Sequence, residues 1–223
     1  MMADRYLRRV DGGTILGMAG DHPAVEVFKG IPYAKPPVGQ LRWQAPQPVE
    51  TWNGVRPAQS FGPRCVQVPI PNTSQAYFPP EPESEDCLYL NVWAPEARVA
   101  SGHPVLVWFH GGSYTRGSGA QPIFNGEGFA RRGIVVVTVN FRVGRLGFLV
   151  HPELSAESGH GASGNYCLMD QIASLQWVQR NIAAFGGDPG CVTVAGQSSG
   201  SYSACYLMVS PLAKGLFHRV IGQ

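Results

Sequence analysis

The sequence is poor in charged residues. Only 14% of the residues are Asp, Glu, Lys or Arg, and the formal net charge is +2. A net charge this small gives little electrostatic attraction to nucleic acid or to an anionic membrane, so we expect neither partner. No apolar run is long enough to cross a bilayer, and no apolar segment follows the first residues. We therefore expect a cytoplasmic protein without a membrane span, or a secreted one if the true start lies upstream.

Signals for metals are also missing. The five cysteines contain no C-x-x-C pair and no spacing typical of metal ligands, so we expect no zinc and no other cofactor. Glycine and proline are abundant instead, with 28 and 19 residues, which indicates many ordered loops. With 223 residues and 44% hydrophobic content, the chain can bury one sizeable core, and a single domain is the default.

Residues 192–201 read V-T-V-A-G-Q-S-S-G-S and predict a strand, a tight turn and the start of a helix. That is the context of a nucleophile elbow, in which Ser198 is exposed at the turn. Gly196 and Gly200 lack the Cβ atoms that would clash there. A serine hydroxyl attacks an ester only if it is exposed and has a base beside it. The alternative interpretation is a Gly/Ser-rich turn without chemistry.

A second Gly-rich segment, H-G-G-S-Y-T-R-G-S-G at residues 110–119, follows the continuous apolar run 105–109. An apolar run of this kind predicts a strand buried on both faces. The loop after it can turn its backbone N–H groups inward to form an oxyanion hole. A phosphate-binding loop is disfavoured, because the segment has no G-K-[ST] and no G-x-G-x-x-G. A plain structural turn is the remaining alternative.

Strands and helices alternate from about residue 105, which predicts an α/β fold with a largely parallel sheet. The expected strands are 105–109, 134–140 and 192–195. The expected helices are a short one near Phe129, one over 165–185 with an apolar stripe, and one to about Val209. We expect small antiparallel or half-buried strands within 1–30 and over 88–93, an irregular segment at 28–43, a mobile loop at 66–82 and loops over 141–164.

Four stretches of the sequence resemble the type-B carboxylesterases, the group that includes the cholinesterases and the bacterial para-nitrobenzyl esterases. They are residues 28–43, residues 85–92 with the signature E-D-C-L, residues 110–113 and residues 164–200. The resemblance implies the α/β-hydrolase fold, with a largely parallel central sheet preceded by small antiparallel strands. It also implies a carboxylic ester hydrolase that acts through a serine acyl-enzyme on small-molecule esters.

The resemblance assigns roles to particular residues. It implies Ser198 as the nucleophile, the backbone N–H groups of Gly112, Ser113 and Ser199 as oxyanion donors, and His110 and Gly111 as support for the loop. Two positions depart from the family pattern: residue 113 is usually Gly or Ala, and residue 199 is usually Ala. Both would donate through the backbone, so the serine side chains should not abolish the hole. Tyr114, Phe109 and Phe124 suggest an apolar lining.

The family's acid and histidine follow the serine in chain order. None of the six histidines matches that catalytic histidine, and those other than His110 are expected to be solvated in loops. We therefore expect a single incomplete α/β-hydrolase domain over 1–223 that lacks the triad acid and histidine, leaves one apolar face of the sheet bare and is inactive alone. Alternatives are a non-catalytic adhesion or scaffold member of the same fold, and an inactive fragment.

The resemblance also implies contacts within the fold. It places a disulfide between Cys65 and Cys87 in secreted members, leaving thiols that we expect to be buried and unpaired at Cys167, Cys191 and Cys205. Two ion pairs that tie loops to the core are expected, Arg42 with Glu85 and Arg142 with Asp170. The simpler expectation for each charge is solvation at the surface.

Overall fold

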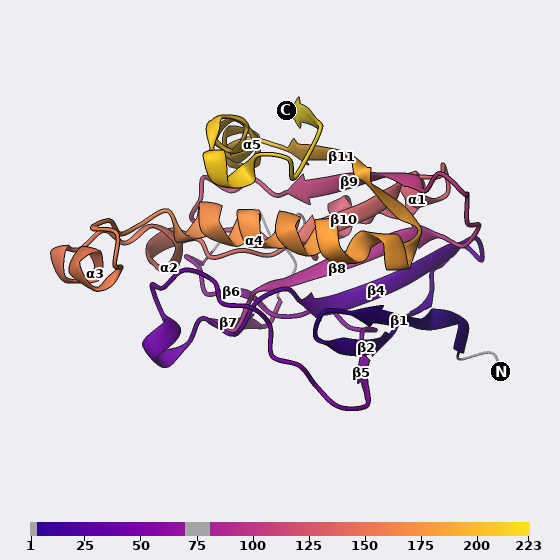
Figure 1. The fold of residues 1–223 in the computed structure, drawn as a ribbon, viewed down its shortest axis with the longest axis horizontal. Helices are drawn as coiled ribbons and strands as arrows, with labels where there is room; N and C mark the ends of the chain where they lie inside the picture. Colours follow the sequence, from indigo (N-terminus) through magenta and orange to yellow (C-terminus); the bar gives the residue numbers. More distant parts are fainter. Residues whose placement is uncertain (1–3, 70–80) are drawn as a thin grey trace.

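The computed structural model describes residues 4–69 and 81–223 and is built around one seven-stranded mixed sheet (Figure 1). The strand order is β12-β11-β9-β10-β8-β4-β3. The four parallel strands are β9 (His103–Phe109), β10 (Val135–Val139), β11 (Gly187–Gly196) and β12 (Arg219–Gly222). The antiparallel strands are β8 (Tyr89–Pro95), β4 (Val25–Pro32) and β3 (Met18–Ala19). The strands after residue 103 are thus parallel, as the alternation of strands and helices predicts.

Smaller elements surround this sheet. A three-stranded sheet contains β1 (Leu7–Val10), β2 (Gly13–Leu16) and β5 (Val55–Pro57), and β6 (Arg64–Cys65) pairs with β7 (Glu83–Ser84). The helices are α1 (Glu127–Ala130), α2 (Gly144–Phe148), α3 (Pro152–Glu157), α4 (Tyr166–Asn181) and α5 (Ser199–Val209). Short 3-10 turns occupy Asp4–Tyr6, Gly39–Leu41, Pro122–Phe124, Ile182–Phe185 and Pro211–Ala213. Among the described residues, no helix combines the length and apolar character needed to span a bilayer.

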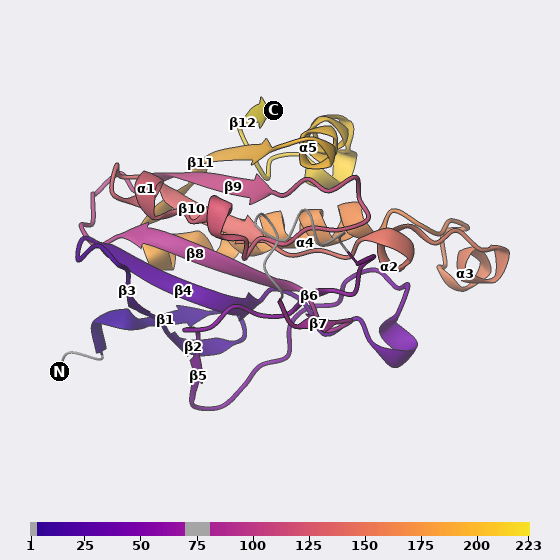
Figure 2. The same ribbon diagram turned by 180° about the vertical axis from the view of Figure 1, so that it is seen from behind.

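Helix α4 covers one face of the sheet, and the short helix α1 lies on the other (Figures 1 and 2). The apolar stripe that predicts α4 is buried from Ile172 to Ile182, and the buried side also includes the polar residues Asp170 and Gln171. A 3-10 turn extends the helical segment, and Gly186 ends it with a φ of 81°. Because only glycine adopts this conformation without strain, the Gly-rich stop signal in the sequence marks the true end.

Several strands differ from the expected burial pattern. Strand β9 is buried on one face only, since Leu106 and Trp108 stay partly exposed on the face opposite α4. Strands β8 and β10 are buried at every position, although alternation predicted β8 to be half-buried. Residues 25–28 of β4, which alternation also predicts to be half-buried, are buried at every position. The second face of these strands is covered by a small cluster that includes Trp93 of β8, Val136 of β10 and Ala130 of α1.

Two segments are more regular than expected. Strand β4 continues through Pro32, with a register shift between Phe28 and Ile31 that surrounds Gly30 (φ 69°), so the irregular segment begins later than residue 28. A bulge keeps the strand in the sheet despite the unpaired residues. The stretch 141–164 contains α2 and α3 and is not only loop. Most of the loop expected at 66–82 falls on residues 70–80, which lie outside the described residues.

Both expected ion pairs are present. Arg142 makes two side-chain bonds to Asp170, Nε–Oδ2 at 2.8 Å and Nη2–Oδ1 at 2.7 Å, and its backbone N–H donates to the same carboxylate. Both side chains are almost fully buried. The Arg142 guanidinium also donates to the carbonyl of Gln44, so the pair ties an early loop to α4. Arg42 and Glu85 form a more exposed contact of 2.6 Å.

All five cysteines are free in the structure. The Cys65 and Cys87 thiols are neighbours: a hydrogen bond from Cys87 lowers the pKa of Cys65, and the same bond together with burial raises the pKa of Cys87. A disulfide between them stays a prediction. Cys167 is buried as expected, but Cys191 is half-buried and Cys205 is exposed. The expectation for these two is wrong, because they lie at outward positions of β11 and α5.

We predict that Arg142→Met destabilises the protein by about 3–5 kcal/mol, because removal of one partner leaves a buried, unpaired carboxylate at Asp170. Arg42→Met is the matched control, and it should change stability little, because water screens the exposed pair with Glu85. Urea unfolding followed by tryptophan fluorescence measures both. Equal losses in the two variants would contradict a special role for the buried pair.

Candidate active site

Ser198 lies at the turn between β11 and α5, with φ 53° and ψ −123°. This backbone conformation is costly for a residue other than glycine and persists only where the surroundings enforce it. Several backbone bonds hold the turn: Ser198 N–H donates to the carbonyl of Gln223 at 2.8 Å, Ser201 N–H donates to the Ser198 carbonyl at 2.9 Å, and Gly200 N–H donates to the Gln197 carbonyl at 2.9 Å. Ser198 is exposed, while Ser199 beside it is buried. The strained turn therefore presents one serine and hides the other.

The turn is pressed against the end of β9 and the loop that follows it. A Cβ atom on Gly200 would lie 2.1 Å from the carbonyl oxygen of Phe109, and one on Gly111 would lie 3.2 Å from Ser198 Cβ. Any side chain at residue 200 would force these backbones apart. The predicted elbow and the predicted Gly-rich loop are thus in direct contact.

The Gly-rich loop has three consecutive residues with positive φ: Gly112 at 119°, Ser113 at 55° and Tyr114 at 59°. The backbone N–H groups of Gly112, Ser113 and Ser199 have no acceptor among residues 4–69 and 81–223. The N–H of Ser199 is free because it belongs to the first residue of α5. The three expected oxyanion donors therefore belong to a loop and a turn that contact each other, and their hydrogen-bonding capacity is unused within the described residues.

His110 is buried and faces its own loop. Its Nδ1 bonds to the carbonyl of Gly111 at 2.8 Å, and its ring stacks on Phe141 with centroids 4.2 Å apart. Burial lowers the pKa of the His110 imidazole to about 4, and the hydrogen bond to Gly111 opposes this only in part. His110 is therefore neutral at pH 7. Its contacts fit the expected support of the loop.

The other histidines lie elsewhere. His103 was expected to be solvated, but it is buried at the start of β9, and its ring nitrogens bond the carbonyls of Ala97 at 2.7 Å and Gly133 at 3.0 Å. His218 is exposed and accepts from Val192 N–H. No described side chain hydrogen-bonds to Ser198 Oγ, and no group of three His, Cys, Asp or Glu in this part of the chain could hold a metal ion.

The sequence did not reveal how the loop is tied to α5. Ser199 Oγ accepts from Tyr114 N–H at 3.3 Å, so its side chain points into the loop. Ser203 Oγ donates to Tyr114 Oη at 3.2 Å and accepts from Gln171 Nε2 at 3.1 Å. Ser199 and Ser203 are four residues apart on α5, which places them on one face of the helix. That spacing was a usable signal for a shared role.

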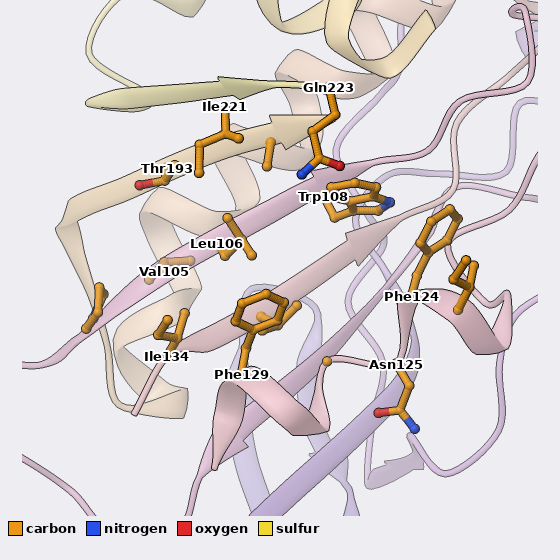
Figure 3. Close-up of a pocket in the computed structure, with 15 residues that line it drawn as sticks. Val105, Leu106, Trp108, Phe124, Asn125, Phe129, Ile134, Thr193, Ile221 and Gln223 are labelled. Atoms are coloured by element: carbon orange, nitrogen blue, oxygen red, sulfur yellow. The ribbon is translucent and has the colours of Figure 1, made fainter. Parts of the chain in front are cut away.

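The three side chains expected to line an apolar pocket do not meet. Phe109 is in the core, and Tyr114 packs on Phe148. Phe124 lies instead in an apolar hollow of about 400 Å³, together with Trp108 and Ile221. Figure 3 shows this hollow on the partly exposed face of β9 and β11, with the Gln223 side chain at one end. Ser198 and the oxyanion donors are not among its lining residues.

Comparisons with known proteins identify the family of the chain. Residues 5–223 match the carboxylesterase family. The chain is 46% identical to the Fumonisin B1 esterase of Sphingopyxis macrogoltabida over 98% of this chain and 39% of that protein. It is 47% identical to the para-nitrobenzyl esterase of Bacillus subtilis (strain 168) over 88% of this chain and 39% of that protein. The chain thus spans about two fifths of the length of these relatives.

Solved structures show the same similarity. A PNB esterase superposes with a TM-score of 0.88 at 42% identity, covering 97% of this chain and 43% of that one. A carboxylesterase of Geobacillus stearothermophilus gives a TM-score of 0.86 at 43% identity, covering 98% and 43% of the two chains. The fold is therefore the α/β-hydrolase fold of these esterases, and the chain belongs to the carboxylesterase family.

Proposed function

We propose that this chain carries the nucleophile and the oxyanion hole of a serine carboxylesterase. Ser198 is the nucleophile, and the N–H groups of Gly112, Ser113 and Ser199 are the oxyanion donors. The observation that carries the proposal is the strained backbone of Ser198, which keeps this serine exposed at a turn in contact with the Gly-rich loop. The N–H groups of Gly112, Ser113 and Ser199 have no acceptor among the described residues. Backbone strain of this size is retained where a site needs it. The named esterases among the relatives support ester hydrolysis as the reaction class.

The proposed reaction has two steps. Ser198 Oγ attacks the carbonyl carbon of a carboxylic ester while a base takes the hydroxyl proton, and the negative charge that develops on the carbonyl oxygen is stabilised by the N–H donors. Collapse of this intermediate breaks the ester bond, and the alcohol leaves with the proton. Water then attacks the acyl-enzyme by the same route, which releases the acid and restores the serine. His110 and Gly111 shape the loop without transferring protons.

The base and its acid partner are proposed to lie outside residues 1–223, so that the chain is one incomplete α/β-hydrolase domain. Two observations support this. No described histidine is bonded to Ser198, and His110, which belongs to the adjacent loop, bonds Gly111 through Nδ1. The chain also spans only 39% of its relatives.

We predict that an organophosphonate probe labels Ser198, and neither Ser199 nor Ser201, in the protein extended past Gln223 to the length of its relatives. Ser198→Ala should remove the label and lower kcat by about six orders of magnitude. Ser201→Ala is the matched control, since it lies on the same helix without the strained turn. Peptide mapping by mass spectrometry identifies the labelled residue. A label on Ser199, or full activity in Ser198→Ala, would refute the assignment, and an absence of any label would favour a non-catalytic member of the fold.

We predict that the 223-residue chain alone does not hydrolyse a short-chain nitrophenyl ester in a saturable way. A serine without a base is a poor nucleophile at neutral pH. The assay compares the purified chain with its Ser198→Ala variant. Saturable turnover that disappears in Ser198→Ala would show that the chain contains its own base.

We predict that His110 makes stability depend on pH below about 6.5. The unfolded imidazole titrates near 6.5 and the folded one near 4, so the unfolded state binds more protons between these values. This contribution to stability is complete above pH 6.5 and falls by roughly 3 kcal/mol as the pH drops to about 4.

Urea unfolding between pH 4 and 7 measures this effect. His110→Asn should flatten the slope of stability against pH, whereas the exposed His160→Asn should leave it unchanged. An unchanged slope in His110→Asn would mean that the folded imidazole is not held neutral.

A further inference from the structure

Gln67, just after β6, hydrogen-bonds to the Gly-rich loop through both polar atoms of its side chain. Its Oε1 accepts from the N–H of Gly117 at 2.8 Å, and its Nε2 donates to the carbonyl of the same residue at 3.1 Å. Within residues 4–69 and 81–223, Gly117 N–H has no other acceptor. These two bonds satisfy both the N–H and the C=O of Gly117, as bonds from a neighbouring strand would. They fix the position and the orientation of the backbone at this residue.

The Gln67 side chain is itself held in place. Nε2 also donates to the carbonyl of Cys65 at 2.9 Å. Cys65 is buried, lies beside Cys87, and its sulfur accepts from the N–H of Val143 at 3.4 Å. The glutamine amide is thus oriented by a residue anchored in the core. A preoriented side chain loses less entropy when it binds a loop than a free one would.

Gly117 lies directly against the residues that precede the oxyanion donors. A Cβ atom at this position would lie 2.2 Å from His110 Nδ1 and 2.5 Å from the carbonyl oxygen of Gly111. The segment between is a tight turn, since Thr115 N–H and Arg116 N–H both donate to the Gly112 carbonyl. The close packing and the tight turn leave no room for Gly117 to shift alone. A displacement of Gly117 must therefore also move Gly111 and Gly112.

We propose that Gln67 is a positioning residue for the oxyanion hole: by clamping Gly117 it sets the place of the Gly112 and Ser113 N–H groups relative to Ser198. This inference rests on the proposed function for its catalytic consequence, but the clamp itself is a property of the loop. Oxyanion donors act only when they are fixed before the charge develops, and a misplacement of about 1 Å costs on the order of 10² in rate.

A second anchor nearby does not replace the clamp. Asn140 Oδ1 accepts from Gly119 N–H at 2.7 Å, and Thr138 Oγ1 donates to the Gly119 carbonyl at 2.7 Å. These bonds hold Gly119 against β10, two residues beyond Gly117, and Ser118 Oγ donates to Glu81 Oε2 at 2.6 Å. None of these bonds involves the N–H or the carbonyl of Gly117, which are bonded to Gln67.

The test uses Gln67→Met, which keeps the length of the side chain and removes its hydrogen bonds, and Gln67→Glu, which keeps only the acceptor. Gln179→Met is the matched control. Gln179 Nε2 also donates to two backbone carbonyls, those of Pro189 and Leu216, but at the far end of β11 from Ser198. Hydrogen exchange of the hydrogen-bonded amides of residues 114–117, kcat and KM are all measured in the protein extended past Gln223.

In Gln67→Met we expect these amides to exchange at least about 10-fold faster. We also expect kcat to fall roughly 10- to 100-fold with KM changed less than about 2-fold, because only the transition state uses the donors. The exchange rates and the kcat of Gln67→Glu should lie between those of Gln67→Met and those of the parent. Gln179→Met should match the parent in both measurements.

Unchanged exchange in Gln67→Met would overturn the clamp. Faster exchange with unchanged kcat would overturn its positioning role. An extended parent protein without Ser198-dependent hydrolysis would overturn the proposed function instead, and the exchange result would still decide on the clamp.

Discussion

Close contact between three backbone segments is the constraint on which the rest of the site depends. The end of β9, the Gly-rich loop and the first turn of α5 approach one another at distances that exclude a single methyl group at Gly200. Bare backbone allows peptide groups, with their fixed dipoles, to take the positions that side chains would otherwise fill. The same packing keeps Ser198 in a conformation that an isolated peptide would leave.

The sequence predicted this part of the molecule well, because its signals are local. The G-Q-S-S-G turn, the strand before it and the helix after it are each specified by neighbouring residues, and the stop at Gly186 follows from one conformational preference. The type-B carboxylesterase resemblance supplied the ion pair between Arg142 and Asp170, which is present. A pairing across 28 residues has no local signature.

What the sequence could not predict depends on how elements cover one another. Whether β8 alternates or is buried throughout is decided by α1 and by the neighbouring strands, not by the residues of β8. His103 reads as a solvated loop residue, yet the fold brings two carbonyls to its ring. The four-residue spacing of Ser199 and Ser203 indicates a shared face of α5, but it does not identify Tyr114, 85 positions before Ser199, as the partner.

The backbone bond between Ser198 N–H and the Gln223 carbonyl has a kinetic consequence. The bond joins the carboxyl ends of two neighbouring parallel strands, since Ser198 follows β11 and Gln223 follows β12, which pairs with β11. Parallel pairing between segments distant in the sequence is slow to form. The geometry of the serine therefore depends on a late pairing, so the turn should be among the last parts of the described structure to mature during folding.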